Sequence, residues 1–287
     1  MRKVIYTTAS GANYTGTTFD LTGAQALAWS NGLLGWSWKA DDNTGAISRK
    51  ARTYKLRAVG LDYGLLNELS RWLESDIEAG LQGKLVVDGW ELLCSASVAD
   101  AKRIGSDIAT VEFTFHTTDP TWRRITTHSL MPNSASDNDV TVTGLNFPFD
   151  FEFDFAGSSS SSKIETIDLS VKSYVRITFF GPCSNPYVRI SSADGATNNI
   201  YGVDAEADFS ERIVIDPLGR KVVGGSVYKV DALGKKTNLY DKRQRGITGS
   251  GTYVFESLPA GALSVSWPQS FGVDIETIEE RGSLPWN

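Results

Sequence analysis

The chain has 287 residues, with 28 Lys and Arg against 34 Asp and Glu and a formal net charge of −6. This length suggests two domains more readily than one, and the acidic balance argues against a surface that holds phosphate groups. No apolar run is long enough to span a bilayer, and no signal-peptide apolar core follows the first residues, so we expect a protein made and folded in the cytoplasm, with no membrane partner.

Aromatic residues and glycines indicate a β-rich fold. The chain contains 8 Trp, 10 Tyr, 13 Phe and 27 Gly, a composition that suits strands joined by many turns. Its two cysteines, Cys94 and Cys183, lie in different halves of the sequence. We therefore expect two buried free thiols, and neither a disulfide framework nor a metal site.

The first 60 residues are predicted to be mostly strand. Between residues 53 and 58 the side chains alternate, so that Tyr54, Leu56 and Ala58 face one way. The loops are expected where glycine and polar residues gather, as at Asn31-Gly32 and residues 41–45. The predicted strands of this region cover residues 4–8, 19–29, 34–38 and 46–59.

One amphipathic helix is predicted after these strands, from Asp62 to Gly80. Asp62 is a good N-cap residue, and Gly80 is placed where a glycine tends to end a helix. Because the helix has a single apolar face, we expect it to lie on a sheet. The apolar face is predicted to comprise Leu65, Leu66, Leu69, Trp72, Leu73 and Ile77, and the polar face Glu68, Arg71, Glu74, Ser75 and Glu78.

A hairpin follows the helix directly. Asp88-Gly89 separates the apolar runs 84–87 and 90–94, and this dipeptide favours a type I′ turn because both of its residues tolerate positive φ. The segment from Ile108 to His116 is then predicted to be a strand with Val111, Phe113 and Phe115 on one face, and Pro120 ends it.

The character of the sequence changes after Arg124. Residues 126–139 are polar and are predicted to link the two domains, which we place at 1–127 and 128–287. In the second, alternating Phe residues from Phe147 to Phe155 predict a strand with one acidic face, followed by a flexible tip at 157–162. Many short strands separated by turn residues predict an antiparallel β-sandwich. The further predicted strands cover residues 164–169, 173–180, 187–191, 200–209, 212–215, 222–230, 251–255, 263–267 and 273–279.

Residue patterns typical of catalytic or metal-binding sites are scarce. We therefore predict no catalytic, cofactor-binding or metal-binding residues and no cofactor. The two histidines, His116 and His128, are more simply explained as surface residues without a catalytic role than as general bases. No motif of a catalytic nucleophile or of a phosphate-binding loop occurs. Residues 41–45 begin like a calcium loop, but Arg52 stands where the closing glutamate belongs. The carboxylates of Asp150, Glu152 and Asp154 share one strand face and favour a solvated surface over a cation site.

A basic segment and several aromatic residues leave binding functions open. Residues 231–249 form a predicted hairpin loop whose charges could touch nucleic acid or an acidic partner, although a solvated loop is the simpler interpretation. Its basic residues are Lys235, Lys236, Lys242, Arg243 and Arg245, with Tyr240 between them. Trp267, Trp286 and Tyr228 would be the candidates for a carbohydrate-binding face, though each also suits a core or an interface.

The order of several segments resembles the distal tail protein (Dit) family of long-tailed, non-contractile phages (siphophages). The resemblance spans nearly the whole chain, although each motif alone is weak and the long polar stretch from Arg212 to Gly251 departs from a compact family member. In the first half it rests on Tyr54-Lys55-Leu56, the helix, the hairpin at 86–89, the strand 111–115 and Asp119-Pro120-Thr121-Trp122. In the second half it rests on residues 145–149, Gly181-Pro182-Cys183-Ser184-Asn185-Pro186, residues 213–216, residues 255–261 and Trp286.

The resemblance implies a mainly β protein with two domains. Residues 1–127 would form a tail-tube-like β-sandwich with one flanking helix, and residues 128–287 a galectin-like β-sandwich. Six copies would form a homo-hexameric ring in the tail tip or baseplate of the virion. The ring would join the tail-tube protein to the tail-tip hub protein, could carry a receptor-binding protein, and would let DNA pass without specific binding.

Two alternatives stay open beside this structural, non-enzymatic interpretation. The chain could be a carbohydrate-binding module or a host-receptor adhesion component, which exposed aromatic side chains on the second sandwich would favour. It could also be a glycoside hydrolase or lyase, which would need a facing pair of carboxylates. A galectin-like shape does not by itself imply sugar binding.

Overall fold

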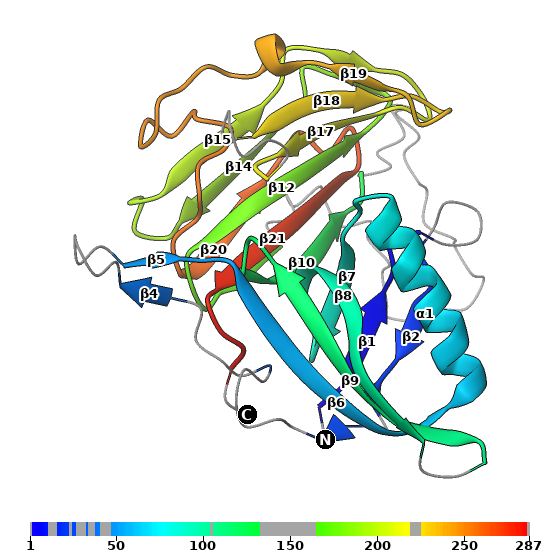
Figure 1. The fold of residues 1–287 in the computed structure, drawn as a ribbon. Helices are drawn as coiled ribbons and strands as arrows, with labels where there is room; N and C mark the ends of the chain where they lie inside the picture. Colours follow the sequence, from blue (N-terminus) through cyan, green and yellow to red (C-terminus); the bar gives the residue numbers. More distant parts are fainter. Residues whose placement is uncertain are drawn as a thin grey trace, which may run out of the picture. The chain divides into compact units, whose positions relative to one another are not determined.

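The computed structural model confirms the mainly β fold class, with antiparallel sheets and, within the described residues, a single α-helix (Figure 1). The chain divides into two compact units, one formed by residues 1–125 with 279–287 and the other by residues 126–278. The structure describes residues 2–10, 16–22, 25–26, 33, 38–40, 47–103, 106–132, 165–218 and 225–285.

The first unit is built on strand β8, which takes part in two layers. Its first residues pair with β7, and its residues from Ser95 onward pair with β9. One layer has the order β2-β1-β7-β8, and the other has the order β3-β6-β9-β8. The strands are β1 (Val4–Thr7), β2 (Thr18–Asp20), β3 (Gln25–Ala26), β6 (Arg52–Asp62), β7 (Gly83–Val87), β8 (Trp90–Arg103) and β9 (Ile108–Thr117), with β4 (Trp38–Ala40) and β5 (Ile47–Arg49) forming a separate pair.

The predicted alternation of β6 and β9 is confirmed by burial. Tyr54, Leu56 and Ala58 are buried in the core of the first unit, opposite the buried aromatic and β-branched residues of β9. Trp122 is fully buried and packs edge-on against Tyr54, with ring centroids 5.7 Å apart. The expected strands 19–29 and 46–59 are each divided, and of 34–38 only its last residue lies in a described strand.

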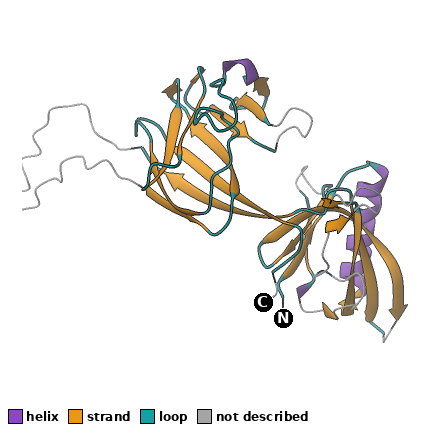
Figure 2. Cartoon of the chain, turned by 90° about the vertical axis from the view of Figure 1, so that its left-hand side faces the viewer, coloured by secondary structure: helices purple, strands orange, loops and turns teal. Residues whose placement is uncertain are grey.

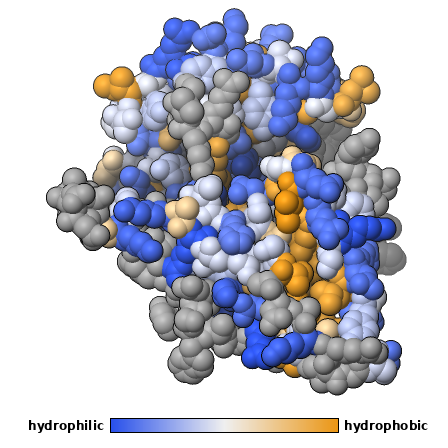
Figure 3. Space-filling model, in the orientation of Figure 1, coloured by the Kyte–Doolittle hydropathy of each residue, from blue (hydrophilic) through white to orange (hydrophobic). Residues whose placement is uncertain are grey.

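Helix α1 (Tyr63–Glu78) confirms the predicted caps but corrects the predicted apolar face. The Asp62 side chain accepts a hydrogen bond from the Gly64 N–H at 2.8 Å, and Gly80 follows the helix with φ 65°. Leu69 and Leu73 are buried against the sheet, whereas Ile77 is 53 % exposed and its neighbour Asp76 is buried. A band of apolar residues (orange) runs along the helix and its neighbouring strands in the space-filling view (Figure 3).

The Asp76 carboxylate explains this reversal. It accepts hydrogen bonds from the backbone N–H groups of Ala9 at 2.8 Å and Ser10 at 2.6 Å. A buried carboxylate is stable only when such donors surround it. The helix therefore uses its last turn to hold the chain that leaves β1, and Ile77 is turned outward.

The predicted hairpin turn is confirmed. Asp88 and Gly89 have φ values of 51° and 81°, the two positive angles that a type I′ turn requires. Val87 pairs with Trp90 across the turn, and both side chains are buried.

The C-terminal segment returns to the first unit. Leu284 is fully buried in its core, and the Arg2 guanidinium donates a hydrogen bond to the Pro285 carbonyl at 2.6 Å. Arg124 bonds both carboxylate oxygens of Glu279, at 2.9 and 3.0 Å. Residues 279–287 thus belong to the first compact unit. The domain boundary between residues 127 and 128 stays a prediction.

The second unit is an antiparallel β-sandwich, as expected (Figure 2). One sheet has the order β11-β20-β14-β15 and the other β19-β18-β17-β12-β21, and apolar residues from both sheets share one core. The strands are β11 (Glu165–Leu169), β12 (Ser173–Phe180), β14 (Tyr187–Ser192), β15 (Asn198–Gly202), β17 (Arg212–Asp216), β18 (Ser226–Val230), β19 (Lys236–Asn238), β20 (Gly261–Ser266) and β21 (Val273–Arg281).

Three details of the second half differ from the prediction. The expected strand 200–209 is split into β15 and the short β16 (Glu206–Ala207), which pairs with β13 (Cys183–Ser184), and the expected strand 251–255 contains only an isolated bridge. The expected polar linker begins inside strand β10 (Trp122–Leu130). The predicted phenylalanine strand 147–155 and the tip 157–162 lie outside the described residues.

Candidate functional site

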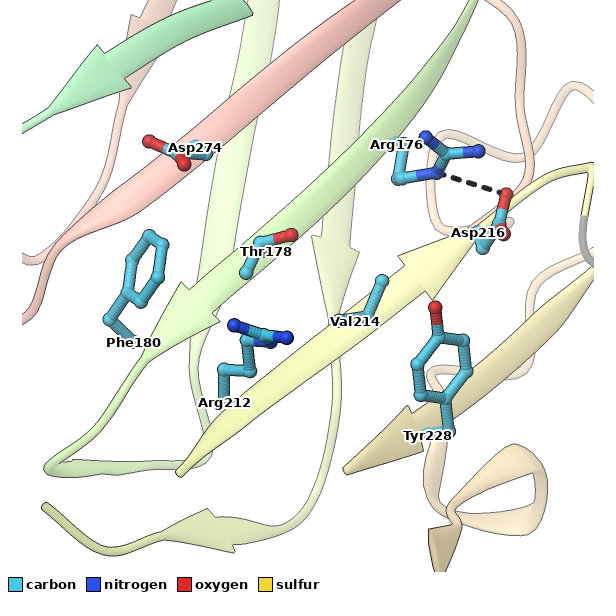
Figure 4. A pocket seen from close by; sticks show the side chains of 8 residues that line it. All are labelled: Arg176, Thr178, Phe180, Arg212, Val214, Asp216, Tyr228 and Asp274. Atoms are coloured by element: carbon cyan, nitrogen blue, oxygen red, sulfur yellow. Dashed lines mark ion pairs between the residues drawn. The ribbon is translucent and has the colours of Figure 1, made fainter. Parts of the chain in front are cut away.

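An open groove lies on the outward face of the β21-β12-β17-β18 sheet of the second unit (Figure 4). Its volume is about 330 Å³, at the lower end of the range of small-ligand pockets. Because side chains alternate along a strand, every second residue of these four strands lies on this outward face, and some of these residues line the groove. The lining residues are Arg176, Thr178, Phe180, Arg212, Val214, Asp216, Tyr228 and Asp274.

The strand register places the residues at the centre of the groove next to one another. Thr178 of β12 is paired with Val214 of β17, and Val214 is paired with Tyr228 of β18. In the next row Phe180 is paired with Arg212. Val214 is 6 % exposed and forms an apolar floor, while Phe180 is 37 % exposed.

An ion-pair network closes one end of the groove. The Arg176 guanidinium lies 3.2 Å from an Asp216 oxygen and 2.9 Å from a Glu276 oxygen. Burial alone would lower the pKa of Arg176, but the two neighbouring carboxylates raise it. Arg176 is thus a fixed cation whose charge is balanced within the protein.

Other polar groups of the groove have no such partner. Among the described residues, neither the Arg212 guanidinium nor the Asp274 carboxylate forms an ion pair or a side-chain hydrogen bond. Burial, and then the charge of Asp216, raises the pKa of Tyr228, so its phenol stays protonated and can donate a hydrogen bond. The Lys236 ammonium lies 4.6 Å from the centroid of the Tyr228 ring.

Of the three aromatic residues considered for a carbohydrate-binding face, the structure brings Tyr228 to the groove. Trp267 is 8 % exposed, and its indole N–H donates to the Phe271 carbonyl at 3.2 Å, so it belongs to the core. Trp286 lies outside the described residues, as do the carboxylates of residues 150–154 and the loop 41–45.

The remaining groups with potential chemistry are dispersed. His116 is exposed on β9 with its Nδ1 3.2 Å from the Thr53 hydroxyl, and His128 is half-buried on β10. Both cysteines are free, as expected, but only Cys94 is buried as predicted, whereas Cys183 is half-buried. Burial raises the pKa of Cys94 to about 12. Within the described ranges no three His, Cys, Asp or Glu residues are grouped to hold a metal ion.

The predicted basic loop contains β19 and a short 3-10 helix, η3 (Tyr240–Lys242), and several of its charges have local partners. The Arg243 guanidinium stacks on the Tyr240 ring at 3.7 Å and donates to the Tyr240 carbonyl at 2.6 Å. Arg245 donates to the Asp241 carbonyl at 3.2 Å. Arg245 also lies 3.9 Å from an Asp241 carboxylate oxygen, so contacts within the loop account for both arginines without a second molecule.

Sequence reasoning singled out Tyr228 but missed Arg212, Asp274, Thr178 and Phe180. Alternation along β12 and β17 marks such residues as outward-facing. It does not tell which strands are neighbours, and β21 joins β12 from about 100 residues away in the sequence.

No helix in the described part of the chain has the length and apolar character to cross a membrane.

No protein-family model and no curated protein matches the sequence. Solved structures do match. A chain of the activated phage p2 baseplate with Sr is similar at a TM-score of 0.50 with 14 % identity, over 99 % of this chain and 100 % of that one. A chain of the phage P2 baseplate with Ca has a TM-score of 0.48 and 13 % identity over 99 % and 100 %, and the Dit protein of phage SPP1 has 0.45 and 10 % over 98 % and 99 %.

At this level of identity the likeness concerns the fold. The match to the p2 baseplate chain with Sr extends over almost the whole of both chains, so it includes the first unit with its helix and the second unit with its sandwich. The resemblance to a phage tail protein that the sequence predicted is thereby confirmed at the level of the fold. The chain has the fold of a phage baseplate protein.

Proposed function

We propose that this chain is a structural protein of a phage tail, forming a hexameric ring at the distal end that joins the tail tube to the tail tip. The observation that carries the proposal is the fold likeness to a p2 baseplate chain, which covers 99 % of this chain and 100 % of that chain. Proteins that share only one domain with a tail component would not match over both lengths. The location that follows is the virion tail.

Exposed apolar side chains of the first unit support a role in assembly. Ile77 in the last turn of α1 is 53 % exposed, Leu81 just beyond the helix is 45 % exposed, and Leu93 on β8 is 45 % exposed. A ring subunit needs surfaces that its neighbours cover, and apolar side chains are the groups that gain most from being covered. Closed head-to-tail contacts between such surfaces produce a ring.

The face best suited to a DNA channel is the outward face of β6 and β9. It carries hydroxyl groups together with charges of both signs, including Lys55 and Glu112, which pair at 2.6 Å. A lysine that is paired in this way holds phosphates weakly, which lets DNA slide along such a wall. The formal net charge of −6 for the subunit acts in the same direction.

Immunogold labelling of virions tests the location. Antibodies against this chain should label particles purified from the strain that encodes it at the end of the tail opposite the head. Tail tubes sheared from heads should keep the label at one end. Label on the capsid, or particles that lack the chain by mass spectrometry, would refute the proposal.

A further inference from the structure

We propose that the groove of the second unit binds a neutral saccharide, about one or two sugar rings in size. This inference is independent of the ring, because every lining residue belongs to the second unit and the groove needs no second copy. A volume of about 330 Å³ suits a ligand of this size rather than a folded partner.

The balance of charges identifies the class of ligand. Two arginines and two aspartates line the groove, namely Arg176, Arg212, Asp216 and Asp274. A phosphate, sulfate or carboxylate group would be repelled by the aspartates, and the charge of Arg176 is already balanced by Asp216 and Glu276. A sugar hydroxyl both donates and accepts hydrogen bonds, so it can bond a carboxylate and a guanidinium together.

The polar groups of the groove that have no ion-pair partner offer both hydrogen-bond donors and hydrogen-bond acceptors. Arg212 offers only donors, Asp274 offers only acceptors, and the hydroxyls of Thr178 and Tyr228 can act as either. In Figure 4, Arg212 and Asp274 lie on opposite sides of Thr178, so that a ligand above Thr178 could contact both. The apolar Val214 and the ring of Phe180 complete the surface and suit the C–H groups of a sugar ring.

The strand pairing argues against a peptide as the ligand. β17 is paired on both sides, by β12 and by β18, and β18 is paired on both sides by β17 and β19. No strand edge is therefore free within the groove for a peptide to extend the sheet, which is a common way to bind an extended chain.

Saturation-transfer NMR on the full chain tests the proposal. The probes are the neutral methyl glycosides of glucose, galactose, mannose, N-acetylglucosamine and rhamnose with their disaccharides, and the anionic comparisons are glucuronate and glucose 6-phosphate. We expect transfer to at least one neutral probe. Transfer to none of them, or to the anionic probes alone, would overturn the inference.

Matched variants locate the binding. Arg212→Gln and Asp274→Asn should each weaken the affinity for the bound probe at least about tenfold, as expected when a charged hydrogen bond is lost. Arg189→Gln and Asp168→Asn change exposed residues of the same type on the opposite sheet and should leave it unchanged. Thermal unfolding verifies that each variant is folded. Equal affinities in all four variants would show that the groove is not the site.

Discussion

At the scale of single residues, Asp76 and Ile77 show where sequence reasoning succeeds and where it ends. The spacing of apolar residues identified the buried Leu69 and Leu73, because helical periodicity depends only on local sequence. It placed Ile77 on the same face, yet Asp76 takes the buried position. The reason is a pair of backbone donors 66 and 67 residues away in the sequence, which no local pattern can reveal.

Replacing Asp76 tests this contact. Asp76→Ala leaves the partly buried N–H groups of Ala9 and Ser10 without their acceptor, at a cost of about 2–4 kcal/mol in the free energy of unfolding. Glu74→Ala, an exposed position on the same helix, should change it by less than about 0.5 kcal/mol. Urea unfolding followed by circular dichroism measures both, and equal stabilities of the two variants would contradict the role given to Asp76.

At the scale of elements, the helix, its caps and the Asp88-Gly89 hairpin were predictable because each depends on residues close in sequence. The alternating strands β6 and β9 were predictable for the same reason. The return of the C-terminal segment was not, because the core that receives Leu284 is assembled from strands before residue 123. Groove residues such as Asp274 escaped prediction for a related reason, since sheet order is a long-range property.

Truncating Leu284 tests the C-terminal return. Leu284 is fully buried in the first unit, so Leu284→Ala should lower the free energy of unfolding by about 2–4 kcal/mol through lost burial and the resulting cavity. Leu233→Ala is the matched control, because Leu233 is 95 % exposed and its truncation leaves no cavity. Urea unfolding with both variants measures the difference, and a Leu284 variant as stable as the control would place this segment outside the core.

At the scale of the whole molecule, the near-complete fold match links both units to one architecture, that of a phage baseplate chain. The outward apolar residues of the first unit and its polar β6–β9 face would then acquire distinct roles, the first in contacts between copies and the second toward the channel. These assignments all depend on the proposed assembly of the chain with copies of itself.

The mass and shape of the purified protein test that assembly most directly. Light scattering after size exclusion should give about 188 kDa, six times the subunit mass of 31.3 kDa. Negative-stain images of the same fraction should show closed rings with a central hole. Recombinant tail-tube and hub proteins should be added in a parallel sample, because neighbours can promote ring closure. A protein that stays monomeric at high concentration in both samples would contradict the ring.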